Sequence, residues 1–431
     1  VALADKDDWI YGMGLDPVLM PDLVLPSKAF LDKIAPNNPL VIVSQTMHSF
    51  WANSTAFAEV SIDNQTVDPG NGSYYGRDQQ GNLNGFISES EAASPFLDNL
   101  KSPLGVVSRY EQTLQNLVES GFTSVASVGF NLPPIMARYA ASDFFAPRIR
   151  QFIYLTDIEL EHLPESPIQD NEFYKILGLK LWHDGSPYTG TMALEEPYLF
   201  NSLTQMMGIS EGHKGEPRLN QQEFEQQITK FSQAGWQLAL HSQGDYSNAS
   251  AAQTFSRLVD NNKQRHRFEH CLLIKQETLE AFQNQGLTPS FHINHILYYG
   301  DALADNIIGE RRAQLILPVK TAFDLALHPT LHADSPMFPA DPISLMKTAV
   351  TRQTKSGKTL GINQAISPQQ ALRTMTINGA WQLHMDDEIG SIEVGKAADL
   401  VILNHNLYEL EPNLWDEIKV SEVWLAGTRK H

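Results

Sequence analysis

Four residues with acid–base or metal-binding side chains stand at or near the ends of apolar runs. The runs are GLKLW, LALH, RFEH and LHAD, and the residues are Lys180, His241, His270 and Asp334. Imidazole and carboxylate groups are ligands for Zn²⁺ and similar divalent ions, which turn bound water into a nucleophile near neutral pH. The set therefore indicates metal-assisted hydrolysis, with Asp334 as the group that transfers a proton.

A lysine in such a set needs an explanation, because its ammonium group repels a cation. Reaction with CO₂ would convert Lys180 into an anionic carbamate that can bridge two metal ions. Each residue also has a structural interpretation. A histidine at a strand end is more often a hydrogen-bonding residue, Lys180 alone would be a snorkelling lysine, and Asp334 before Ser335-Pro336 could form a turn. The order of all four along successive strands favours the site.

Eight apolar runs provide the strands that would position these residues. They cover residues 39–43, 122–128, 149–155, 176–182, 236–241, 267–273, 287–293 and 325–334. Helical patterns separate them, for example at 219–234, where Asn220 and Glu223 have the spacing of a capping box. Alternating strands and helices predict βα units and a parallel sheet, with catalytic groups at the carboxyl ends of the strands.

Two regions depart from this alternation. Residues 44–100 are rich in Asn, Gly and Ser and are interpreted as an insertion. Residues 387–431 are expected to form short strands and turns, a separate small β module. We therefore predict a main domain over residues 1–386 and a C-terminal β module over residues 387–431.

Composition limits the classes of partner. The 431 residues carry a formal net charge of −19, which argues against nucleic acid or an anionic membrane, because phosphate groups need a basic face. The single Cys271 excludes an internal disulfide framework and fits a cytoplasmic protein. No apolar run is long enough for a transmembrane helix. The oligomeric state is open, and a homodimer is a common state for enzymes of this size.

Further motifs run through the whole chain. They include WIYGMGLD (9–16), MHSFWANSTAF (47–57), NGFISE (84–89), KLWHDGSPYTG (180–190), HSQGD (241–245), RHRFEH (265–270), HADSP (332–336) and GSIEVGKAADLVIL (390–403). With these motifs the chain resembles the YtcJ-like branch of the amidohydrolase superfamily, which includes N-substituted formamide deformylase and exoenzyme regulatory proteins such as AepA. The resemblance implies an α/β fold, a (β/α)₈ TIM-like barrel that binds metal, with a small β-sandwich.

The resemblance also assigns roles. It implies His241 and His270 as metal ligands, Asp334 as ligand and proton shuttle, and Lys180 as the carbamylated bridge. The family places an H-x-H pair of ligands at the end of its first barrel strand, and none of the fourteen histidines shows that spacing. We expect that the sequence begins after this first strand and after part of the β-sandwich; the alternative is a family member without the pair. One or two ions, Zn²⁺ by expectation, would bind in a complete site.

Other residues are candidates for contacts to substrate. His48, in MHSFWANS, corresponds to a family motif near the substrate and is expected to contact substrate or stabilise an oxyanion; a loop hydrogen bond is the alternative. His292, His295 and Tyr298 in FHINHILYYGD, together with Trp182, are expected to line a pocket or to pack in the core.

The sequence thus leads to one main hypothesis and one alternative. The main hypothesis is a metal-dependent hydrolase of a non-peptide C–N bond, such as an amide or formamide, acting on a small molecule. The alternative is a metal-free binding or regulatory protein on the same scaffold, which would explain the missing H-x-H pair. Glu269, next to His270, is a candidate partner that supports a ligand.

Overall fold

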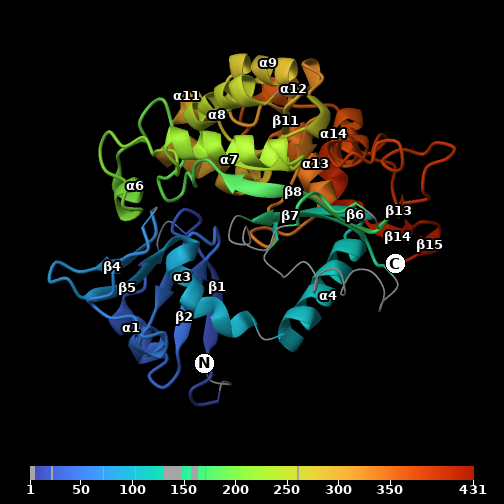
Figure 1. Ribbon diagram of the computed structural model, residues 1–431. Coiled ribbons are helices and arrows are strands. Elements are labelled where there is room, and N and C mark those ends of the chain that lie inside the picture. Colours follow the sequence, from blue (N-terminus) through green and yellow to red (C-terminus); the bar gives the residue numbers. More distant parts are fainter. Residues whose placement is uncertain are drawn as a thin grey trace. The chain divides into compact units, whose positions relative to one another are not determined.

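The computed structural model describes residues 5–20, 23–70, 72–101, 103–130, 147–156, 164–169, 171–259 and 262–431. The chain forms two compact units (Figure 1). The first comprises Val1–Arg109, Ser186–Thr191 and Phe200–Glu211, and the second Tyr110–Gly185, Met192–Leu199 and Gly212–His431. The predicted insertion at residues 44–100 lies within the first unit, and its boundaries stay a prediction.

The first unit is built on a five-stranded mixed sheet in the order β1-β2-β3-β5-β4. Its strands are β1 (Ile10–Leu15), β2 (Leu40–Ser44), β3 (Ser49–Ala52), β4 (Tyr74–Arg77) and β5 (Leu83–Ser88), and its helices include α1 (Lys28–Ile34), α2 (Ser54–Glu59), α3 (Glu89–Leu97) and α6 (Ser202–Met206). Phe50, Phe57 and Phe96 are buried in its core. The strand predicted at residues 39–43 forms as β2, but it pairs in this sheet, because a short turn returns the chain antiparallel as β3.

The second unit contains a seven-stranded sheet whose strands follow one another in chain order. They are β6 (Ser124–Phe130), β7 (Arg150–Thr156), β8 (Tyr174–Trp182), β9 (Gln237–Ser242), β10 (Arg267–His270), β11 (Thr288–Phe291) and β12 (Thr330–Leu331). Every neighbouring pair is parallel. The predicted parallel sheet is therefore confirmed, and all seven carboxyl ends lie at one edge.

Helices precede, connect and follow the strands of this sheet. They are α4 (Pro103–Glu119), α7 (Gln221–Gln233), α8 (Asp245–Leu258), α9 (Gln276–Gln285), α10 (Asn294–Ala302), α11 (Glu310–Ala313), α12 (Val319–Asp324), α13 (Pro342–Thr351), α14 (Pro368–Thr374) and α15 (Ile377–Gln382). In Figure 1, α7, α8 and α9 lie on one face of the sheet. The capping box of α7 is present, with Asn220 and Glu223 bonded reciprocally, and Phe224 and Ile228 are buried as the sequence predicts.

The sheet curls around a cavity of about 400 Å³. Residues of β6, such as Val128, and residues after β12, such as Asp334, line this same space although the two strands are the opposite edges of the sheet. A sheet whose edges face one cavity has the curvature of a partial barrel. Seven strands are present in the described ranges, and an eighth that would close the (β/α)₈ barrel stays a prediction.

The end of the chain forms a three-stranded antiparallel sheet. Its strands are β13 (Leu400–Leu403), β14 (Val420–Leu425) and β15 (Thr428–Arg429). Val423 packs against Leu114 and Val118 of α4, and Arg150 on β7 binds Asp399 with an Nε–Oδ2 distance of 2.6 Å. The short strands agree with the expected β character, whereas the β-sandwich and its boundary at residue 387 stay predictions.

No helix within the described ranges is both long enough and apolar enough to cross a bilayer.

The close contact of β8 with its neighbours leads to a stability prediction. A Cβ atom at Gly178 would lie 2.3 Å from the Gln237 carbonyl oxygen and 2.5 Å from the Tyr154 ring. Gly178→Ala should therefore lower the free energy of unfolding by about 3 kcal/mol, because backbone and a buried ring must both move. Gly379→Ala on α15 is the matched control, since nothing lies within 4 Å there. Urea unfolding of both variants measures the difference, and equal midpoints would contradict this packing.

Candidate metal centre

Ionisable residues from the strand ends line the cavity inside the curled sheet. Lys180 on β8, His270 on β10 and Asp334 after β12 all line it, together with Glu269 and His332. Three of the four residues predicted from strand-end positions therefore line one cavity. The fourth, His241, does not line this cavity.

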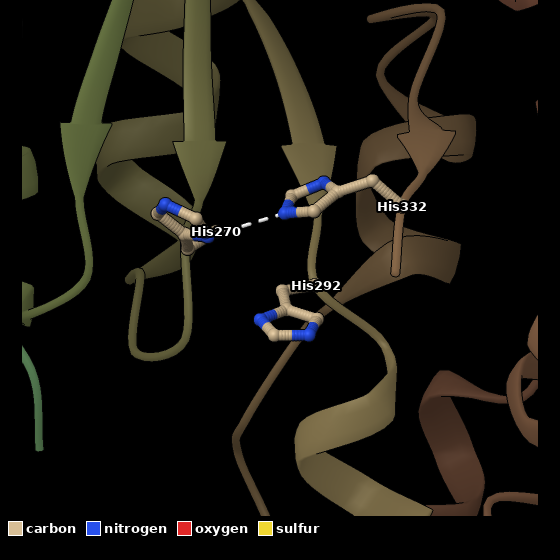
Figure 2. A group of neighbouring side chains, drawn as sticks. All are labelled: His270, His292 and His332. Carbon is tan, nitrogen blue, oxygen red and sulfur yellow. Dashed lines mark hydrogen bonds between the residues drawn. The ribbon is translucent and has the colours of Figure 1, made fainter. Parts of the chain in front are cut away.

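Three histidines from neighbouring strands form a cluster, which we call the imidazole cluster (Figure 2). His270 ends β10, His292 follows β11 and His332 follows β12, and one nitrogen of each lies within 4.8 Å of those of the others. His332 Nε2 lies 3.1 Å from His270 Nδ1, and His332 Nδ1 lies 2.9 Å from Ser290 Oγ. These separations allow three ring nitrogens to bind one ion.

The backbone is strained at two of these positions. His270 has φ of 76° and Asp334 has φ of 53°, which for residues other than glycine is the sparsely populated left-handed region. Such conformations persist where the surrounding structure imposes them, and they concentrate at functional sites. The surrounding structure therefore imposes these backbone conformations, which set the directions of the His270 and Asp334 side chains.

Burial keeps the imidazole cluster uncharged. Loss of solvation lowers the pKa of His270 and of His332 well below the ordinary value of 6.5, and neighbouring cationic groups lower it further. Burial also lowers the pKa of His292, against the opposing charge of Asp334. Neutral imidazoles carry the lone pair that a metal ion needs, so near pH 7 the cluster is ready to bind without first releasing protons.

One nitrogen atom of the imidazole cluster has the environment expected of a metal ligand. His292 Nε2 is buried and has no hydrogen-bond partner within the described part of the chain. Buried polar atoms are nearly always satisfied, so an unsatisfied ring nitrogen in a cluster of imidazoles is consistent with a missing ligand. The donor set and this atom together fit a divalent metal ion.

Lys180 has the environment of a neutral amine. Its side chain is buried, and loss of solvation lowers its pKa, while Glu269 and Asp334 oppose the shift. Arg267 forms an ion pair with Glu269, with Nε 2.9 Å from Oε1, and so offsets much of the negative charge of Glu269. An uncharged amine is the form that reacts with CO₂, so these surroundings are compatible with a carbamate on Lys180.

His241 lies beside the imidazole cluster. Its ring centroid is 4.3 Å from that of His270, and its Nε2 lies 3.2 Å from the Gly185 carbonyl oxygen. The turn after β9 is fixed by Asp184, which accepts hydrogen bonds from the backbone of Gln243 and Gly244 and from the Ser247 hydroxyl. The structure thus brings His241 next to His270.

The aromatic candidates occupy the same end of the sheet. The rings of His295 and His292 are 4.3 Å apart, and Tyr298 stacks on Phe338 at 4.1 Å. Lys180 Nζ lies 5.4 Å from the Trp182 ring. Their assignment to substrate binding stays a prediction. His48 belongs to the first unit, where its Nδ1 lies 2.8 Å from Glu89 Oε2.

The sequence reasoning did not select His332. The signal was present, because alternate residues of an extended strand point to one side, and His332 is two residues before Asp334. His292 was selected as a substrate contact, whereas its position in the imidazole cluster also makes it a candidate ligand.

Comparisons with known proteins agree with this fold. A sequence model described as the amidohydrolase family matches residues 1–429. N-substituted formamide deformylase of Arthrobacter pascens is 24% identical over 98% of this chain and 79% of its own length. The putative amidohydrolase YtcJ of Bacillus subtilis is 19% identical, again over 98% of this chain and 79% of its own length. An uncharacterized metal-dependent hydrolase from Pyrococcus horikoshii superposes with a TM-score of 0.74 and 21% identity, covering 95% of this chain and 79% of that one.

A metal-binding measurement tests whether the imidazole cluster holds an ion. We expect Co²⁺ or Zn²⁺ to bind the protein, and His292→Ala to weaken binding at least about 100-fold, because a ligand is lost. His384→Ala is the control, since that exposed ring bonds the Gln264 carbonyl away from the cluster. Cobalt absorption titrations measure both. Unchanged affinity in His292→Ala would show that the ion, if bound, is held without this residue.

The burial of two further histidines leads to a prediction of how the stability of the protein depends on pH. Burial lowers the pKa of His183 to about 4 and that of His266 to about 3, from 6.5. Below pH 6.5 these two histidines become protonated in the unfolded chain, whereas in the folded chain they stay neutral to a lower pH. The free energy of unfolding should therefore fall as the pH is lowered, by up to ~1.4 kcal/mol per pH unit for each such histidine.

Unfolding midpoints from pH 7 to pH 5 measure this slope. His266→Asn should reduce the slope, and His405→Asn, which alters an exposed ring, should leave it unchanged. A wild-type stability that does not change over this range would contradict the burial of these rings.

Proposed function

This chain belongs to the amidohydrolase family, and we propose that it is a metal-dependent hydrolase of a non-peptide C–N bond in a small molecule. The observation that carries the proposal is the cavity at the carboxyl ends of the parallel strands. There Lys180, Asp334, His270 and His332 line one cavity, next to His292 of the imidazole cluster. In barrels of this class the chemistry takes place at this edge of the sheet.

His270 is the central ligand of the proposed site. It belongs to the imidazole cluster, and its ring is also next to His241, which the family pattern pairs with it. His292 and His332 would supply further nitrogen ligands, and Lys180 as its carbamate and Asp334 would supply oxygen ligands. A divalent ion held there, for which Zn²⁺ fits the nitrogen-rich donors, would supply a Lewis acid and lower the pKa of bound water.

The carbamate would form when the uncharged Lys180 nitrogen attacks the carbon of CO₂. An N–C bond forms, one C–O π bond opens, and the proton on nitrogen is lost to solvent. The lowered pKa of Lys180 favours the neutral amine that this step requires.

Asp334 is the proposed acid–base group. Its carboxylate would take a proton from the attacking water and pass it to the nitrogen of the leaving amine as the C–N bond breaks. Asp334 has a left-handed backbone conformation, which for a residue other than glycine is most often kept at functional sites.

The proposed substrates are small amides or N-substituted formamides. The deformylase relative acts on N-substituted formamides by its name, and the cavity of about 400 Å³ has the size of a small-molecule site. Trp182, His295 and Tyr298 are proposed to surround the substituent on nitrogen.

Replacement of Asp334 tests the mechanism. Asp334→Ala, assayed with a bound divalent ion on a panel of amides and N-substituted formamides, should lower kcat/KM about 10³-fold because proton transfer is lost. Asp324→Ala, at an exposed ion pair with Lys320 on α12, is the control. Wild-type turnover in Asp334→Ala would exclude this mechanism, and binding of the panel without any turnover would favour a binding or regulatory protein.

A further inference from the structure

Ser290 stands in the middle of the three strands that carry the imidazole cluster. It belongs to β11, where its backbone is in register with Glu269 of β10 on one side and with Thr330 of β12 on the other. Its side chain is buried, and it lines the same cavity as Lys180 and Asp334. The serine has no part in the hydrolytic steps proposed for those two residues.

The hydroxyl group of Ser290 holds one nitrogen of His332. Ser290 Oγ lies 2.9 Å from His332 Nδ1. The carboxylate oxygen Oε2 of Glu269 is 4.0 Å from the same nitrogen, which is beyond hydrogen-bonding distance. Both oxygens of Glu269 accept instead from Arg267, at 2.9 and 3.3 Å. Within the described part of the chain, the serine hydroxyl is therefore the hydrogen-bond partner of Nδ1.

The other nitrogen of His332 faces His270 (Figure 2). His332 Nε2 and His270 Nδ1 are 3.1 Å apart, and a hydrogen bond between them needs one proton between the two atoms. A neutral imidazole carries one N–H group and one lone pair, so the His332 ring donates at one end and accepts at the other. The ring is thus held at both ends, and either of its two tautomers satisfies these contacts.

A serine hydroxyl is suited to both tautomers of His332. It donates when Nδ1 has the lone pair and accepts when Nδ1 has the proton, whereas a carboxylate or a carbonyl oxygen only accepts. Metal ligation through Nε2 requires the second tautomer, because the lone pair of Nε2 must be free and the proton then lies on Nδ1. In that state no proton lies between the rings of His270 and His332, and Ser290 Oγ is the acceptor for Nδ1–H.

We propose that Ser290 is a positioning residue for His332 in the imidazole cluster. Its hydroxyl directs Nε2 into the cluster, next to His270, and accepts the Nδ1 proton when a divalent ion is bound. Partners of this kind act through the ring that they orient, and they strengthen its binding of the ion. The inference rests on the proposed function in one respect, the presence of a divalent ion at the imidazole cluster.

Cobalt absorption titrations of a double-mutant cycle test this role. Ser290→Ala should weaken Co²⁺ binding about 10-fold in the wild-type background, because the hydrogen bond to Nδ1 is lost, and should cause no further loss in a His332→Ala background. Ser232→Ala is the matched control, since it removes another buried hydroxyl, which bonds the Ile228 carbonyl oxygen on α7. Unchanged affinity in Ser290→Ala, or equal losses in both backgrounds, would overturn the proposal.

A second measurement reads the tautomer of His332 directly. In Zn²⁺-loaded protein labelled with ¹⁵N at histidine, the His332 signals, assigned by their loss in His332→Asn, should show the proton on Nδ1. In Ser290→Ala this proton should stay on Nδ1 and its signal should move upfield, because it has lost its acceptor. A proton on Nε2 in the Zn²⁺-loaded wild type would overturn the inference, since Nε2 would then not be the ligand.

The two measurements separate a failure of the inference from a failure of the proposed function. Weaker Co²⁺ binding in Ser290→Ala, together with no turnover of any amide by the wild type, would refute the proposed function alone. Amide turnover with an ion whose affinity does not depend on Ser290 would refute the inference alone. Failure of the wild type to bind either Co²⁺ or Zn²⁺ would overturn both.

Discussion

The chemistry proposed for the second unit depends on the burial of side chains at the carboxyl ends of its parallel strands. In water, an amine is protonated near neutral pH and an imidazole is partly so. Here burial lowers the pKa of Lys180, His270 and His332, which favours the neutral form of each side chain, the form with a free lone pair. Reactivity toward a cation or toward CO₂ therefore arises from where the side chains lie, because the same groups at an exposed strand end would be hydrated and charged.

When such groups are buried, other contacts must compensate for the hydration that they lose. Arg267 and Glu269 neutralise each other on β10, within the wall of the cavity. The side chain of Gln382 on α15 donates to the Thr288 hydroxyl and accepts from the Thr330 hydroxyl, at 2.7 and 2.9 Å. This amide links β11 and β12, the strands that precede His292 and His332. Polar networks satisfied in this way fix the relative position of strands more precisely than apolar packing does.

Much of this arrangement could be read from the sequence, because its signals are local. Apolar runs predicted the strands that became β6 to β12, and the residue types at their ends pointed to the cavity. His332 was overlooked because β12 is only two residues long, so the predicted run at residues 325–334 did not show which side chains turn inward. The mixed sheet of the first unit was also missed. Its strands pair through turns rich in polar residues, and tertiary pairing rather than periodicity defines them.

The pairing of His48 with Glu89 shows the limit of sequence reasoning most clearly. Each residue belongs to a recognisable motif, yet nothing in either motif states that the two are partners. The register of β3 against β5 brings them together, and a shift of one residue would turn both side chains to other surroundings. Only the structure supplies that register.

The chain-order arrangement of the parallel sheet has a consequence for folding. Each strand from β7 to β12 pairs with the strand that precedes it, so every new pairing closes a loop of one βα unit. Such a loop costs less entropy to close than a loop between distant parts of the chain. The imidazole cluster draws its three rings from β10, β11 and β12, the last strands in this series. The nitrogen donors therefore lie within 62 residues of one another along the chain, and three consecutive strands of the sheet are enough to bring them together.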